Sequence, residues 1–315
     1  MKRRAIFIVM ALTTWVAGSA LGAMGGSVAA TAQGSGIVVG KAHAGFTPSL
    51  TGTKPIVLLM VGSGARPGDD VEHSLADSLH LVFINPAKHH ATLVGIPRDS
   101  YVPIPNHGTS KINSSLFYGG PALLVDTIEN MSGVTIDYWA ITTFWGFEDM
   151  IDGIGGLTMD VPFAMSDSYA RADFQPGVQE LNGKEALAFA RTRHDLLQGD
   201  FGRQENGGRL FLASLAQFQK EYKADPSRLF VWLGSGMRNI DTTAPLSEVM
   251  ALAFTASHIP VKNVQNVVLP GSAGMSGSLS VVFLDSARKT AIFNDVKTDG
   301  ILLKKNVPPS PTAGE

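Results

Sequence analysis

The chain has 315 residues, of which 44% are hydrophobic and 17% charged, with a formal net charge of −2 at pH 7. A chain of this size and composition buries a full hydrophobic core, which excludes extensive disorder away from its ends. It contains no cysteine, so disulfides and thiolate metal sites are excluded, and its acidic balance lacks the electrostatic footprint of a nucleic-acid-binding protein.

The N-terminal segment predicts export. Residues 2–4 are basic and precede a run, 5–40, without a charged side chain. A basic start favours an N-terminus that stays inside while the rest of the chain is exported. Because about 20 apolar residues span a bilayer, we expect a single membrane anchor over residues 1–33 and a body outside the cytoplasm. A small-residue cleavage site at 30–32 leaves a cleaved signal peptide, and thus a secreted protein, as the alternative.

Residues 34–54 are rich in Gly, Ser and Thr, which predicts a spacer between the membrane and a body that begins at Pro55. Short apolar runs ending at Gly or Pro are typical of buried strands. The chain has such runs at 55–62, 78–86 and 91–97.

The next segments alternate between helix and strand. Residues 119–133 predict an amphipathic helix, because Pro121 suits a first helical turn and Gly133 a stop. A strand-like run, 136–144, and a second helical pattern, 145–156, follow. This alternation predicts an α/β fold in which a mixed central β-sheet is layered between helices.

Three arginines cluster where one helix ends and another begins. Asn182 and, three residues later, Glu185 form a capping-box pattern that starts a helix. Arg191 and Arg193 lie about 200° apart on a helix but on one side of an extended chain, so they share a ligand only if the helix has ended by Arg191. Arg203 would lie near the start of the next helix, where free N–H groups favour an anion. The alternative is a solvated helix end paired with nearby acidic side chains.

The C-terminal third carries weaker signals. A helix is predicted at 247–256, and strand-like runs occur at 263–271 and 278–285. No linker precedes them, so we expect one domain over residues 55–303. The polar, Pro-rich residues 304–315 predict a disordered tail.

Further polar residues follow the predicted strand 91–97. Arg98 and Asp99 come directly after it, and ligands of open α/β sheets bind beyond the carboxyl ends of strands. Lys111 and Asn113 follow in "SKINSS". With these residues in place, the chain resembles the LytR-CpsA-Psr family of cell-wall glycopolymer ligases. The matching blocks run in the family's order and include "ADSLHLVFINP", "GIPRDSYVPIP", "KINSSLFYGGPALLVDTIENMSG", "PGVQELNGKEALAFARTRHD" and "GDFGRQ".

The resemblance implies an extracytoplasmic phosphotransferase held by one N-terminal anchor. Such enzymes bind a polyprenyl-diphosphate-linked glycan, pass the glycan phosphate to a peptidoglycan hydroxyl and release polyprenyl phosphate, with a divalent cation such as Mg²⁺. The rival interpretation is a relative that binds polyprenyl diphosphates without turnover.

Carrying the family's site over residue by residue assigns a role to each matching position. Asp77 is implied as a Mg²⁺ ligand. Asp99 either orients Arg98 or accepts a proton, and Lys111 and Asn113 either position phosphate or sugar or only shape their loop. Asp200 would steady the arginine cluster. The implied diphosphate contacts are Arg98, Arg191, Arg193 and Arg203, with Gln204 near them.

Two departures from the family pattern concern the cation. Gly64 stands where family members commonly carry a metal-ligating aspartate, and Leu75 stands where an arginine is common. Mg²⁺ would then be coordinated by Asp77, the substrate phosphates and water, which is acceptable for an ion that retains several waters. Asp69 or Asp70 is a substitute ligand if its loop folds back; otherwise both are solvated loop charges.

Overall fold

The computed structural model describes residues 36–43, 52–194, 196, 198–237 and 240–312. The expected membrane anchor, 1–33, lies outside the described residues. Within the described part of the chain, no helix is long and apolar enough to cross a bilayer.

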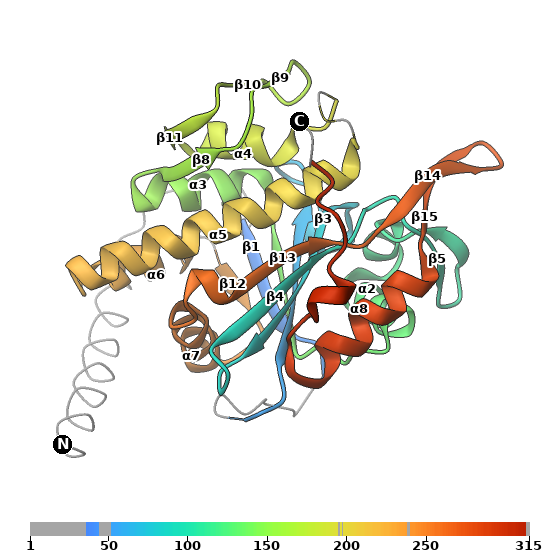
Figure 1. The fold of residues 1–315 in the computed structure, drawn as a ribbon, viewed down its shortest axis with the longest axis horizontal. Coiled ribbons are helices and arrows are strands. Elements are labelled where there is room, and N and C mark those ends of the chain that lie inside the picture. The colour runs from blue at the N-terminus through green and yellow to red at the C-terminus, as the bar shows by residue number, and fades with distance from the viewer. Residues whose placement is uncertain (1–35, 44–51, 195, 197, 238–239, 313–315) are drawn as a thin grey trace. The chain divides into compact units, whose positions relative to one another are not determined.

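A seven-stranded mixed sheet forms the centre of the fold (Figure 1). β2 pairs in parallel with β7 and antiparallel with β3, and β4 joins β3 antiparallel and β13 in parallel. This arrangement confirms the mixed α/β fold expected from the sequence. In spatial order the strands are β12 (Ile240–Thr242), β1 (Ile37–Lys41), β7 (Tyr138–Thr142), β2 (Ile56–Ser63), β3 (Ala76–Asn85), β4 (His90–Gly95) and β13 (Val264–Val268).

Helices cover both faces of this sheet. α2 (Ser114–Ser132) and α8 (Ser286–Asp299) lie on one side, and α5 (Asp200–Ala224) and α7 (Leu246–Ser257) on the other (Figure 1). Successive side chains of a strand point to opposite faces, so β3 contributes side chains to the hydrophobic core on each side of the sheet. Leu81 and Phe83 join the cluster with α2 and α8, whereas Val82 and Ile84 join the cluster with α5 and α7.

A smaller apolar cluster surrounds α4 (Gly183–Arg191). Leu157, Phe174, Leu181 and Phe189 are buried in it. The cluster orients the segment that carries the clustered arginines. Its other elements are α3 (Phe144–Ile154), α6 (Arg228–Met237) and the hairpins of β8 (Leu157–Val161) with β11 (Gly177–Leu181) and β9 (Met165–Asp167) with β10 (Ala172–Phe174).

Two further hairpins and several short turns complete the fold. β5 (Tyr101–Ile104) pairs with β6 (Gly108–Lys111), and β14 (Gly271–Ser276) pairs with β15 (Leu279–Leu284). The 3₁₀ turns are η2 (Val71–His73), η3 (Val261–Asn263) and η4 (Lys304–Asn306).

The interpretation of residues 34–54 as a spacer is wrong for its first part. Ile37–Lys41 forms β1, which lies between β7 and β12 inside the central sheet. The β-branched side chains of Ile37, Val38 and Val39 fit a pleated, buried surface, and this preference outweighs the Gly-rich surroundings. The folded body therefore begins before Pro55.

The expected disorder of residues 304–315 does not hold as far as Thr312. Glu205 of α5 is 8% exposed, and its carboxylate accepts hydrogen bonds from the hydroxyls of Ser310, at 2.7 and 2.8 Å, and of Thr312, at 2.8 Å. Arg209 completes the network with an ion pair to Glu205, 3.4 Å, and a hydrogen bond to Thr312 Oγ1, 2.7 Å. A buried carboxylate requires such partners, so these contacts order the polar, Pro-rich segment as far as Thr312.

We predict that Thr312→Val lowers the free energy of unfolding by about 1–3 kcal/mol, because the variant leaves both Glu205 and Arg209 short of a hydrogen bond. Urea unfolding at pH 7 measures the change. Thr290→Val is the matched control, since the exposed Thr290 hydroxyl bonds only to Ser286 O in its own helix. Equal stability of the two variants would contradict the assignment of the tail contacts.

Candidate functional site

Antiparallel pairing of β3 and β4 brings the first predicted site residues together. His80 lies opposite Gly95, so Asp77, near the start of β3, lies beside the residues that follow β4. There Arg98 and Asp77 form an ion pair through Arg98 Nη1 and Asp77 Oδ1. Residues separated by twenty positions in sequence thus meet at one edge of the sheet.

The α4–α5 junction supplies the remaining charges. α4 ends at Arg191, which is the condition for Arg191 and Arg193 to face one ligand. Gly199 adopts φ +47° before α5 begins at Asp200. This left-handed conformation suits glycine. Arg203 forms an ion pair with Asp200, and Asp200 Oδ2 accepts a hydrogen bond of 3.2 Å from the backbone N–H of Arg98. Asp200 therefore links the junction to the end of β4.

Asp99 connects two more cations to this cluster. Its carboxylate lies 3.0 Å from Lys111 Nζ and 3.9 Å from Arg193 Nη2. The carboxylate that pairs directly with Arg98 is that of Asp77 and not that of Asp99. Of the alternatives open in the sequence, the geometry supports an orienting role for Asp99, directed at Lys111 and Arg193 and not at Arg98.

The arginines of the cluster differ in how well their charge is compensated. Burial lowers the pKa of Arg98, but the carboxylates of Asp77, Asp99 and Asp200 outweigh it, so the net pKa is raised. Burial lowers the pKa of Arg203; Asp200 offsets part of this effect, and the positive charges of Arg98 and Arg193 lower the pKa again. A further negative charge beside Arg203 would therefore offset the effect of burial on its guanidinium.

Arg203 also has unsatisfied hydrogen-bond donors. Its side chain is 11% exposed, and neither Nε nor Nη2 makes a hydrogen bond of acceptable geometry. Nη2 touches Asp200 Oδ1, but the angle makes this contact an ion pair without a hydrogen bond. Arg98 Nε is likewise buried without a partner. Buried donors normally find acceptors, so the site is suited to the oxygens of an anion.

Asn113 and Gln204 adjoin the cluster. The backbone N–H of Asn113 donates to Arg98 O at 3.2 Å, and its carbonyl accepts from Ala76 N at 3.3 Å, which supports the loop-shaping alternative for Asn113. Gln204 is 1% exposed, and neither atom of its side-chain amide has a partner among the described residues. Its backbone carbonyl accepts from His80 Nε2 at 2.9 Å, and burial lowers the pKa of His80, so this histidine is a neutral donor.

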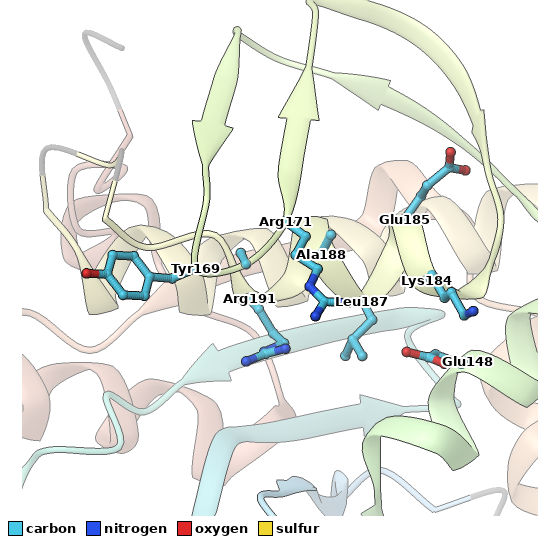
Figure 2. Close-up of a pocket in the computed structure, with 9 residues that line it drawn as sticks. Glu148, Tyr169, Arg171, Lys184, Glu185, Leu187, Ala188 and Arg191 are labelled. Atoms are coloured by element: carbon cyan, nitrogen blue, oxygen red, sulfur yellow. The ribbon is translucent and has the colours of Figure 1, made fainter.

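Arg191 is not brought into this cluster by any described contact. Its guanidinium lies 4.8 Å from the centre of the Phe144 ring, and it lines a separate pocket of about 500 Å³ together with Arg171 and Lys184. Figure 2 shows Arg191 extending from the end of α4 into this pocket on the same side as Arg171. The cluster of guanidinium groups therefore consists of Arg98, Arg193 and Arg203.

Asp167 of β9 is a positioning residue that the sequence analysis missed. It is 2% exposed, and its Oδ2 accepts hydrogen bonds of 2.9 Å from the backbone N–H groups of Arg193 and His194. Burial raises the pKa of Asp167, but these bonds and those from Ala170 N and the His194 ring lower it well below its ordinary value. The only sequence signal is the tendency of Asp to bond the backbone two residues on, which does not reveal the long-range partners.

The position of Gly64 fits the implied cation site in part. Gly64 N donates to Leu75 O at 2.9 Å, so Gly64 lies against the start of β3, and a Cβ built on it would be 2.8 Å from Asp77 Oδ2. A carboxylate at position 64 would therefore share a cation with Asp77. Among the described residues, no group of three or more His, Asp or Glu side chains is arranged to hold a metal ion. If Mg²⁺ binds here as the family resemblance implies, its oxygen donors would be Asp77 and the ligands that a phosphate and water add.

Asp69 and Asp70 line the same pocket as Gly64 and Asp77. Their carboxylates have local partners: Asp69 accepts from Arg66 N at 2.8 Å, and Asp70 accepts from Glu72 N at 3.0 Å and contacts His73 Nδ1 at 3.0 Å. These bonds account for both side chains as loop-stabilising groups, and neither is required as a cation ligand.

Comparison with known proteins gives a consistent picture. The model of the LytR_cpsA_psr family matches residues 29–298. The chain is 40% identical over 159 residues to the polyisoprenyl-teichoic acid–peptidoglycan teichoic acid transferase TagU of Bacillus subtilis, covering 50% of each protein. It is 30% identical over 229 residues to B. subtilis TagV, a transferase of the same description, covering 70% of this chain and 57% of TagV.

A solved structure shares the fold. The crystal structure of B. subtilis TagV matches with a TM-score of 0.65 and 27% identity, over 79% of this chain and 98% of that one. The chain spans about half the length of the TagU relative that it matches.

We predict that Asp167→Asn lowers the free energy of unfolding at pH 7 by about 1–3 kcal/mol, because an amide is a weaker acceptor for the two backbone N–H groups. The folded-state pKa of Asp167 lies below its ordinary value of about 3.9, so the stability it contributes is present above that pH and is lost as the pH falls below it. Urea unfolding at pH 7 and pH 3 should show a smaller difference between wild type and variant at pH 3.

Asp173→Asn is the control for this prediction, since Asp173 is exposed on the partner strand β10. If Asp167→Asn is as stable as Asp173→Asn at pH 7, the carboxylate does not hold the Arg193 segment.

Proposed function

The chain belongs to the LytR_cpsA_psr family, and from that premise we propose that it transfers an anionic glycopolymer from a polyprenyl-diphosphate carrier to a hydroxyl of peptidoglycan. Polyprenyl phosphate is the released product. The name of the TagU relative, a polyisoprenyl-teichoic acid–peptidoglycan teichoic acid transferase, supports this donor and acceptor. The observation that carries the proposal is the cluster of Arg98, Arg193 and Arg203, in which Arg98 Nε and Arg203 Nε are buried N–H donors without a partner among the described residues.

A diphosphate suits this cluster physically. Bidentate guanidinium–phosphate contacts are charge-assisted, and each such hydrogen bond contributes about 1.5–3 kcal/mol. The nearby carboxylates compensate the charge of Arg203 only in part. Lys111, which pairs with Asp99, adds a further positive charge to the cluster. The carboxylates keep the cations oriented before the substrate arrives, so little reorganisation is needed at the moment of reaction.

The reaction is a displacement at phosphorus. The acceptor hydroxyl oxygen forms a bond to the glycan-bearing phosphorus, and the bond from that phosphorus to the bridging oxygen of the diphosphate breaks. The electron pair of the broken bond leaves with polyprenyl phosphate, and the hydroxyl proton passes to solvent. Arg98, Arg193 and Arg203 bind the diphosphate oxygens and stabilise the charge that develops on them, which is the main requirement of phosphoryl transfer.

Mg²⁺ is part of this proposal. Asp77 would hold the cation through Oδ2, which faces Gly64, while Oδ1 remains paired with Arg98. A bound Mg²⁺ supplies additional neutralisation of phosphate charge. The side chains of this chain bind and orient the diphosphate in the same way whether or not that charge is added.

We place the reaction outside the cytoplasm, at the membrane. A polyprenyl carrier remains in the bilayer, and a protein anchored through residues 1–33 would hold its body close to that carrier, which raises the effective concentration of one for the other. The basic start and uncharged apolar run are the features that support this location.

One observation favours a second candidate function. Gly64 removes a carboxylate from the side of Asp77, so a cation is held by fewer protein ligands. A protein that binds polyprenyl diphosphates without turnover would have the same arginine cluster. Incubation with a polyprenyl-diphosphate glycan, Mg²⁺ and peptidoglycan separates the two, because only the transferase releases polyprenyl phosphate.

We predict that Arg98→Ala weakens binding of farnesyl diphosphate at least about tenfold, since the variant removes a charge-assisted contact and leaves Asp77 without its partner. Isothermal titration calorimetry measures the dissociation constant. Arg288→Ala is the control, because Arg288 is exposed on α8 and pairs only with Asp285 within its own turn. Unchanged affinity in Arg98→Ala would contradict the proposed diphosphate site.

We also predict that Gly64→Asp tightens Mg²⁺ binding roughly tenfold in the presence of pyrophosphate, because it adds a carboxylate beside Asp77 Oδ2. Gly64 lies outside the left-handed region, but its Cβ would lie 2.8 Å from Asp77 Oδ2, so the Asp77 carboxylate must shift slightly in any variant with a side chain at position 64. Gly64→Asn is the matched control, since it adds nearly the same volume without the charge. Equal Mg²⁺ affinity in the two variants would show that position 64 does not face the cation.

A further inference from the structure

A second pocket adjoins the arginine cluster at Asp77. Its volume is about 460 Å³. Asp77 is shared, because one of its carboxylate oxygens pairs with Arg98 while the side chain also lines the pocket. The lining residues are Gly64, Asp69, Asp70, His73, Ser74, Leu75, Asp77 and Phe117.

The chemistry of this pocket differs from that of the cluster. No lysine or arginine is among the described residues that line it, whereas Asp69, Asp70 and Asp77 contribute three carboxylates. Apart from a cation held at Asp77, such a lining offers a phosphate group no positively charged partner. It suits a ligand that donates hydrogen bonds through hydroxyl groups, since an ionised carboxylate only accepts.

The pocket also has an apolar wall that faces solvent. Phe117 is 55% exposed and Leu75 is 46% exposed, and they come from different segments, α2 and the residues before β3. Single exposed apolar residues are ordinary, but two that line one pocket beside carboxylates form a surface with both apolar and hydrogen-bonding character.

The backbone holds this wall in place. α2 departs from helical geometry at Gly119 and Gly120, the first of which is two residues after Phe117, and Gly120 adopts φ +64°. A Cβ on Gly120 would lie 3.1 Å from His73 Nε2, so the loop carrying His73 packs closely against the kink. The side of the pocket that carries Phe117 is therefore fixed against the side that carries Asp70 and His73.

We propose that this pocket binds the ring of the accepting sugar. This inference rests on the proposed function, because it assigns the acceptor half of the same transfer. An uncharged pyranose presents hydroxyl groups at its edge and C–H groups on its faces, which matches carboxylates beside an aromatic side chain. Since Asp77 lines this pocket and also pairs with Arg98, a hydroxyl of the bound sugar would lie next to the phosphorus held at Arg98.

The size of the pocket agrees with this occupant. Sites for small molecules typically have volumes of about 300–1,000 Å³. A volume of about 460 Å³ accommodates a sugar ring beside a cation held at Asp77. Phe117 and Leu75 are thus specificity-determining residues for the acceptor, and the arginines are those for the donor.

The test compares acceptor and donor parameters in one variant. The acceptor probe is a β-1,4-linked tetramer of N-acetylglucosamine, and the donor probe is a short-chain polyprenyl-diphosphate-linked N-acetylglucosamine. We expect Phe117→Ala to raise the acceptor KM about fivefold, the effect of losing one aromatic contact, and to leave the donor dissociation constant unchanged. Phe117→Tyr should restore the wild-type KM. Phe254→Ala is the control, since Phe254 is 46% exposed on α7 and does not line the pocket.

The outcomes distinguish the two proposals. If wild type neither binds the donor nor releases polyprenyl phosphate, the proposed function fails. If wild type is active and Phe117→Ala has an unchanged acceptor KM, the acceptor site is overturned. Calorimetric titration of the pyrophosphate-loaded protein with the tetramer tests the pocket without turnover: binding weakened by Phe117→Ala supports the site, and absence of binding overturns it.

Discussion

The site depends on carboxylates that hold like-charged guanidinium groups close together. Arg98, Arg193 and Arg203 repel one another, and the lowered pKa of Arg203 reflects that repulsion after burial. Asp77, Asp99 and Asp200 each contact one or more of these cations and thereby fix their positions. At short range and reduced dielectric, the Coulomb attraction within such a pair is stronger than within a surface ion pair. Breaking one of these pairs leaves a charge without a partner.

The fold brings these charges together through a few long-range contacts. The antiparallel pairing of β3 with β4 places Asp77 beside Arg98, and Asp200 binds the backbone of Arg98 from the start of α5. Asp167 holds the Arg193 backbone from the hairpin of β9 and β10. The C-terminal segment contacts α5 two residues after Arg203, through Glu205. Arg98 and Arg193 are thus positioned by elements remote from them in sequence, whereas Arg203 pairs with Asp200 of its own helix.

Much of this arrangement follows from local sequence signals. The capping box at Asn182 and the start of α5 just before Arg203 could be read from residue type and spacing, whereas the end of α4 at Arg191 was only the condition for Arg191 and Arg193 to share a ligand. The alternation of apolar runs gave the order of strands and helices. These features are local, because caps, turns and periodicity act within a few residues.

Other features depend on partners that spacing does not reveal. β1 lies in a Gly-rich segment and is stabilised by β7, and Asp167 and Thr312 act through contacts far along the chain. Arg191 was expected among the diphosphate contacts, but as the last residue of α4 it lies over Phe144, a contact that helical periodicity alone does not specify.

The most direct test of the account is a crystal structure of the protein with farnesyl diphosphate and Mg²⁺. The account requires diphosphate oxygens within hydrogen-bond distance of Arg98, Arg193 and Arg203. A diphosphate bound at Arg171 and Lys184 instead, with the three arginines still paired only to carboxylates, would contradict it.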